Sequence, residues 1–268
     1  MTAPAPHRLV LSAAEFAYLV DRTGVDLPPD WMPGSDVPFG LAESGLAKKR
    51  VVHGVGDEAV VHPSVERNLL ILAGPTVMLD TVVSVGDQGM HSVHAVSGPL
   101  GASLFALGEG AVELSMFAAV DLGKELVRAV PDVDDETDSA IESRLGGGAG
   151  PKALQGKLPL AALQEMGVVR LFREADPEGP SAVVSRLNLS GQEAALAYGV
   201  ATKTDGALRC LVSSQVETSQ VSWIHCDGGW SGLDPEPDGS GRRMVRIEPV
   251  SREDLGTWVA PAVAGAVS

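Results

Sequence analysis

The sequence predicts an α+β fold, in which a central antiparallel β-sheet is flanked by helices and is made of two pseudo-symmetric halves. Apolar residues alternate with more polar ones along 76–118, which is typical of an antiparallel meander. Helical spacing with capping signals precedes and follows this stretch. A similar order of elements returns later in the chain, which indicates that the two halves are related.

The first helix has the clearest boundaries. Ser12 followed by Glu15 is a capping-box signal, and it predicts a helix that runs through Val20 and ends at Gly24. The elements expected around it are a strand at 7–11, an irregular loop with four prolines at 25–40, a short helix at 41–48 and a strand pair at 50–61.

A second helix is predicted from Pro63, a residue that suits the first helical turn, to Gly74. The meander follows it. Asp121 is then expected to cap a helix that ends at Pro131. The strands predicted for the meander are 76–85, 90–97, 103–107 and 112–118.

The chain is expected to form one domain with a first half at 1–130, an acidic and then glycine-rich linker or loop at 131–151, and a second half at 152–268. Within the second half, 168–174 either extends a preceding helix or forms a strand. The other elements predicted there are a helix at 159–166, strands at 194–201, 208–216, 221–225 and 243–248, a loop at 227–241, and a final helix after Ser251.

A similarity between two segments of the chain supports its division into two related halves. The segment 117–120 leads into Asp121, a helix and Pro131, and 247–250 leads into Ser251, a helix and Pro261. The spacing from cap to proline is the same in both segments. Each half is therefore expected to contain a helix, a meander and a second helix.

Charge and composition exclude several classes of protein. The formal net charge of −15 disfavours nucleic acid as a partner, because an acidic surface repels phosphates. No apolar run reaches the roughly 20 residues that span a bilayer, and no signal peptide is recognised, so we expect a cytosolic protein without membrane insertion. Cys210 and Cys226 are interpreted as buried, reduced thiols.

No motif predicts catalysis, a metal or a cofactor. His91 and His94 would point to opposite faces of a strand and could not chelate one ion well. The adjacent His225 and Cys226 diverge for the same reason. The sequence therefore favours a protein that is not an enzyme, although an active site built from scattered residues stays possible.

Three local patterns follow one another along the chain: Leu11-Ser12-Ala13-Ala14-Glu15-Phe16 followed by Leu27-Pro28-Pro29-Asp30-Trp31; Val60-Val61-His62-Pro63 followed by Leu69, Leu72, Ala73 and Pro75; and Val221-Ser222-Trp223 followed by Val245-Arg246-Ile247-Glu248-Pro249-Val250. Together they resemble the EspG family of type VII (ESX) secretion chaperones. The resemblance covers nearly the whole chain. The segment 225–230 departs from the family pattern and leaves the subgroup open.

This resemblance implies a pseudo-twofold fold and a cytosolic chaperone without a cofactor. Such a protein binds the apolar tip of the PPE protein in a PE–PPE heterodimer, keeps it soluble and guides it to an ESX machinery. The resemblance places the contact on the central sheet and the second-half helices. The candidate partner-binding residues are Val85, Gln88, Met90, Val212, Ser214 and Val216.

Two readings compete with the chaperone. Val85, Val212 and Val216 would equally suit the core and Gln88 a solvated turn, so the sequence leaves open which sheet face is exposed. The first alternative is a scaffold that forms a homodimer by strand pairing at a sheet edge. The second, less favoured, is a small-molecule enzyme without a recognisable motif.

Overall fold

A computed structural model describes residues 8–33, 41–131, 153–227, 229–237 and 241–267. Three predicted segments lie partly outside these residues. They are the start of the strand at 7–11, the second part of the loop at 25–40, and nearly all of the linker at 131–151.

The body of the described chain is a ten-stranded sheet with the order β1-β7-β6-β5-β4-β9-β10-β11-β12-β8. All neighbouring strands in it are antiparallel. The strands are β1 (Arg8–Leu11), β4 (Val77–Val85), β5 (Gln88–Ser97), β6 (Leu100–Ala106), β7 (Val112–Ala118), β8 (Gly156–Pro159), β9 (Thr204–Ser214), β10 (Thr218–Cys226), β11 (Gly229–Pro237) and β12 (Arg243–Val250). A separate small sheet pairs β2 (Val52–His53) with β3 (Val60–Val61).

The strand order confirms the predicted α+β class and its two pseudo-symmetric halves. β4 and β9 pair at the centre, from Val77 opposite Ser214 to Val85 opposite Gly206. Outward from this pair, each half continues with the next three strands in sequence and ends with a short strand that precedes them. β1 and β8 are these equivalent edge strands.

The helices described are α1 (Ala13–Thr23), α2 (Ala42–Lys48), α3 (Pro63–Ala73), α4 (Leu122–Val127), α6 (Leu160–Leu171), α7 (Gly179–Arg186), α8 (Gly191–Lys203) and α9 (Leu255–Val267). The predicted first helix is confirmed. The backbone N–H of Ser12 donates to Glu15 Oε2 at 2.8 Å, and Gly24 ends the helix with φ at 63°.

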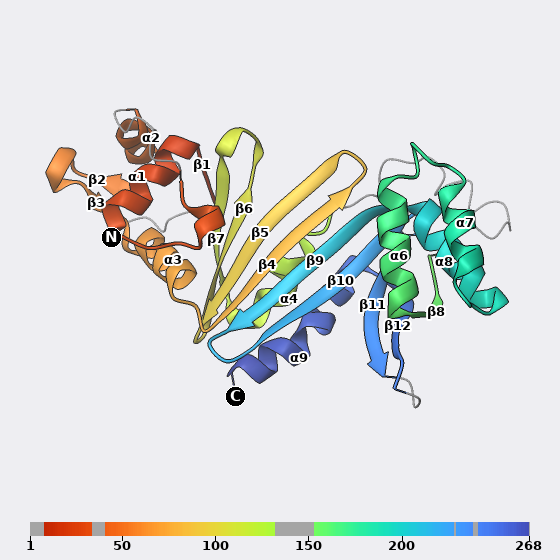
Figure 1. Cartoon of the computed structure of the whole chain (residues 1–268). Helices are drawn as coiled ribbons and strands as arrows, with labels where there is room; N and C mark the ends of the chain where they lie inside the picture. The colour runs from red at the N-terminus through yellow and green to blue at the C-terminus, as the bar shows by residue number, and fades with distance from the viewer. Residues whose placement is uncertain (1–7, 34–40, 132–152, 228, 238–240, 268) are drawn as a thin grey trace, which may run out of the picture.

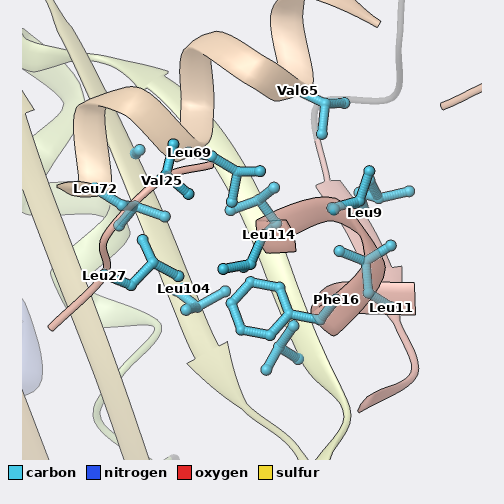
Figure 2. Packing of buried hydrophobic residues seen from close by; sticks show 14 of the residues in the cluster. Leu9, Leu11, Phe16, Val25, Leu27, Val65, Leu69, Leu72, Leu104 and Leu114 are labelled. Atoms are coloured by element: carbon cyan, nitrogen blue, oxygen red, sulfur yellow. The ribbon is translucent and has the colours of Figure 1, made fainter. Parts of the chain in front are cut away.

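Helices cover the sheet in three groups (Figure 1). α4 and α9 pack on one face of the central strands, around Leu79, Leu208 and Trp223. On the opposite face, α1 and α3 cover the first half, and α6 and α8 cover the second half around Leu158 and Met166. The first-half core joins residues of α1, α3, β1, β6 and β7 (Figure 2), among them Leu9, Leu11, Phe16, Val65, Leu69, Leu72, Leu104 and Leu114.

Two second-half predictions were wrong. Residues 194–201 form part of α8, because Ser190 and Glu193 make a reciprocal capping box and the following alanines favour a helix. The predicted loop at 227–241 contains β11. Its Pro235 and Pro237 lie beyond Leu233, where the pairing with β10 ends, so neither proline removes a hydrogen bond from a strand that is paired on both sides.

The final helix also differs from its prediction, because it does not end before Pro261. α9 runs through this proline to Val267, and Ala262, Val263 and Ala266 beyond it pack on the central core. This packing offsets the hydrogen bond that proline removes. The sequence left open whether 168–174 extends a helix or forms a strand. Residues 168–171 extend α6. Asp121 makes no capping hydrogen bond and instead pairs with Lys124 at 2.6 Å.

Candidate functional site

The central strands leave part of one sheet face without a helix packed over it. Alternate side chains of β4 and β9, such as Val83 and Leu208, point to α4 and α9 and are buried. Their neighbours point to the other face, where they are half-buried or exposed, and Val82 is 37% exposed. Met78 packs against the first-half core. The other neighbours, here called the open strip, are Asp80, Val82 and Ser84 of β4 and Ala207, Arg209, Leu211 and Ser213 of β9.

The open strip lies between the two helix groups on that face (Figure 1). The antiparallel register carries it across four strands, because Val82 is opposite both His91 and Arg209, and Arg209 is opposite Ser222. Apolar, basic and acidic side chains are thus presented together on a flat sheet surface. Such a surface suits a protein partner better than it suits a small molecule.

The first-half border of the strip is aromatic. His91 Nε2 lies 2.8 Å from Asp80 Oδ1, and the ring of His91 lies 4.5 Å from that of Trp31. Trp31 enters from the proline-containing loop that precedes α2. These rings line a cavity of about 280 Å³ together with Phe16 and Met32.

The second-half border is formed by α6, whose last turns expose large apolar side chains. Val168, Leu171 and Phe172 are 56%, 77% and 61% exposed. The opposite side of α6 is buried through Ala162 and Met166. Val168 and Phe172 are four residues apart and share a helix face, so they form an apolar stripe rather than scattered positions.

The six predicted partner-binding residues do not come together. Val85 and Val212 lie in the core under α4 and α9, at 7% and 2% exposure, and Met90 packs against the same core. Gln88 is exposed at the β4–β5 turn. Ser214 and Val216 lie at the β9–β10 turn, where Val216 is 83% exposed and its N–H donates to Ser214 Oγ.

The two turns lie at opposite ends of the central pair. Val85 is opposite Gly206, whereas Ser214 is opposite Val77, at the other end of β4. Eight residues of extended strand span roughly 27 Å at about 3.4 Å each. Val85 and Val212 are therefore expected to contribute to stability. Gln88 and Val216 lie too far apart to belong to one small partner-binding surface.

Sequence reasoning missed the residues of the open strip and of α6. Both faces of β4 carry apolar side chains. Met78 and Val82 are on one face, and Leu79 and Val83 are on the other. The pattern alone could not show which side is covered. The close spacing of Val168, Leu171 and Phe172 was the available signal, because the buried side of the same helix is complete without them.

The titratable groups make hydrogen bonds that stabilise the fold. His91 and His94 point to opposite faces, as predicted. Burial and the nearby Arg128 lower the pKa of His94 to about 3, and its ring contacts Ser103 Oγ at 2.8 Å. His225 Nδ1 lies 2.7 Å from Asp205 Oδ1. Among the described residues, no three His, Cys, Asp or Glu side chains gather as ligands for a metal ion.

Both cysteines are free and buried. Burial raises the pKa of Cys210 to about 11, so its thiol stays protonated at neutral pH. No helix in the described part of the chain is long and apolar enough to cross a membrane.

Comparisons with known proteins give one informative result. The sequence matches no protein-family model and no curated protein. The fold is similar to a solved structure, that of the Mycobacterium tuberculosis type VII secretion system chaperone EspG5 in complex with the PE25–PPE41 dimer. The match has a TM-score of 0.62 and 14% sequence identity, and it covers 94% of each chain. The chain therefore has the EspG5 fold along nearly its whole length.

Proposed function

We propose that this protein is a cytosolic chaperone of the EspG type. It binds the PPE protein of a PE–PPE heterodimer, keeps the dimer soluble and delivers it to an ESX type VII secretion system. The observation that carries the proposal is the whole-chain likeness to a chaperone that was solved with a PE–PPE dimer bound to it. The local sequence patterns that resemble the EspG family support it independently.

We assign the partner contact to the open strip and to the apolar stripe of α6. Val168, Leu171 and Phe172 supply exposed apolar area of the kind that marks protein interaction sites. The open strip adds Val82 and Leu211, together with Arg209, which is opposite Val82 and two residues before Leu211 on β9. A partner with an exposed apolar tip would be covered by this surface, and its aggregation would be suppressed.

The rigidity of the surface suits a chaperone that must also release its partner. The strip lies on paired strands that are fixed from behind by α4 and α9, so binding orders few new residues. A preformed surface of moderate size gives specific binding that is still reversible.

Self-association through a sheet edge is the competing hypothesis, and the edges disfavour it. β1 and β8 have four residues each. Lys49 Nζ donates to the carbonyl oxygen of Val10 at 2.8 Å, and β8 ends at Pro159, which has no N–H. Short edges that carry a lysine or a proline resist pairing with another chain.

Co-expression with PE–PPE pairs encoded by the same genome tests the proposal. Each pair is purified through an affinity tag on this protein and analysed by size exclusion. We expect one pair to form a stable 1:1:1 complex and to become more soluble than without this protein. Failure with every pair, together with a homodimer of this chain, would favour the scaffold hypothesis instead.

A further inference from the structure

The end of α6 brings two guanidinium groups to one backbone carbonyl. Arg170 Nε donates to the oxygen of Thr204 at 3.1 Å, and Arg173 Nη1 donates to the same oxygen at 3.0 Å. Arg173 also donates to the oxygen of Thr202 at 3.2 Å. These hydrogen bonds attach α6 to the junction of α8 and β9.

The positive charge at this point is not neutralised by an ion pair. Within the described residues neither Arg170 nor Arg173 lies within ion-pair distance of a carboxylate, although the chain has 35 acidic and 20 basic residues. By contrast, Arg128 pairs with Glu113 and Glu125. The two neighbouring positive charges therefore repel each other, and no carboxylate pairs directly with either of them.

The surroundings of Arg170 act on its pKa in both directions. Burial lowers the pKa of Arg170, and the charge of Arg173 lowers it further. Asp205 is the nearby acid that acts in the opposite direction, and its carboxylate contacts His225 at 2.7 Å. An anion placed between the two guanidinium groups would relieve their repulsion.

Hydrogen-bond donors remain for such an anion. The bonds to Thr204 and Thr202 use one nitrogen of each arginine, and no other acceptor contacts the remaining guanidinium nitrogens in the part of the chain that the structure describes. The Oγ1 atom of Thr204, the residue whose carbonyl oxygen both arginines bond, is buried without a hydrogen-bond partner. A carboxylate can accept from two guanidinium groups at once, and these bonds are stronger than neutral ones.

We propose that Arg170 and Arg173 bind a carboxylate side chain of the protein partner, next to the apolar contact at Val168, Leu171 and Phe172. The partner then carries an Asp or Glu beside its apolar tip. This inference rests on the proposed function for the identity of the partner, whereas the recognition of a carboxylate belongs to the two arginines themselves.

The first experiment measures the affinity of a captured PE–PPE dimer for R170Q, R173Q and the control R186Q at low and high salt. Arg186 is exposed on α7 and bonds to its own helix at Ala182. We expect R170Q and R173Q to bind about tenfold more weakly at low salt and to lose much of the salt dependence, with R186Q unchanged. R173K, which keeps the charge, should retain part of the affinity, even if R170Q loosens α6. Affinities and salt dependence equal to the wild type would overturn the proposal.

A second experiment needs no partner protein. Succinate is titrated into the whole chain labelled at arginine, and the Nε–Hε resonances are followed by NMR. The signals of Arg170 and Arg173 should shift at lower succinate concentrations than that of Arg186. Equal shifts at all three would overturn the carboxylate site, whatever the PE–PPE pairs show. A positive titration without any bound pair would instead leave the site standing and contradict the chaperone.

Discussion

Gly123 of α4 and Gly256 of α9 lie against each other under the central strands. A Cβ atom built on Gly256 would be 3.1 Å from the Cα of Gly123, whereas one built on Gly123 would be 4.0 Å from the Cα of Gly256. α4 and α9 are equivalent helices, since each follows the last meander strand of its half. The two halves therefore meet where these glycines let the helices approach closely.

Because of this contact, alanine should have different effects on stability at the two glycine positions. Gly256→Ala places a methyl group against backbone that cannot rotate away, and we expect a loss of about 1–3 kcal/mol in the free energy of unfolding. Gly123→Ala meets ordinary contact distances, so its gain in helix propensity, up to about 1 kcal/mol, should be retained. Urea unfolding of both variants tests the contact, and equal stabilities would contradict it.

The alternation along β4 predicts opposite effects for two adjacent valines. Val83 is 1% exposed under α4 and α9, and Val82 is 37% exposed on the open strip. Val83→Ala should destabilise the protein by roughly 1–3 kcal/mol. Val82→Ala should leave the unfolding free energy within about 0.5 kcal/mol but weaken the binding of a PE–PPE dimer. The account of the strip fails if Val82→Ala binds as the wild type does.

Trp31 offers a fluorescence signal from the strip side. Of the four tryptophans, Trp223, Trp230 and Trp258 pack in the core of α4 and α9 on the opposite face. Binding of a PE–PPE dimer should therefore change emission through Trp31, which contacts His91 at the border of the strip. In Trp31→Phe the change in emission should be largely lost. Persistence of the full change in that variant would place the contact elsewhere.

The buried His94 predicts a loss of stability in acid. Its pKa is about 3 in the folded protein and near 6.5 when unfolded, so the unfolded chain binds more protons between these values. Stability should therefore fall as pH decreases below about 6.5, by at most about 1.4 kcal/mol per pH unit. The slope of unfolding free energy between pH 6.5 and 5 should be shallower in His94→Gln. An unchanged slope would show that other groups cause the acid sensitivity.

Much of the fold could be predicted because local signals agreed with it. The capping box at Ser12 and the period of two in the meander both became the expected elements. The failures came where packing overrides local preference. β11 contains Pro235 and Pro237 beyond the end of its pairing with β10, where proline is tolerated. α9 continues past Pro261 because the residues beyond it are packed.

The candidate surface was harder to predict than the fold. Whether Val82 or Val83 faces solvent depends on where α4 and α9 pack, and these helices lie far from β4 in sequence. Similarly, the spacing of Arg170 and Arg173 makes them neighbours, but their shared hydrogen bonds to the carbonyl of Thr204 depend on where α6 packs. A single sequence does not contain these long-range contacts in readable form.

The measurement that tests the central claim most directly is the affinity of a PE–PPE dimer for Phe172→Asp and for a matched control, Val120→Asp. Phe172 is 61% exposed at the end of α6, and Val120 is 93% exposed just before α4, the helix that packs on the opposite sheet face. Both variants should unfold like the wild type, because neither side chain is buried. We expect Phe172→Asp to weaken binding more than tenfold and Val120→Asp to leave it unchanged. Equal affinity of both variants and the wild type would contradict the assignment of the partner contact to this surface.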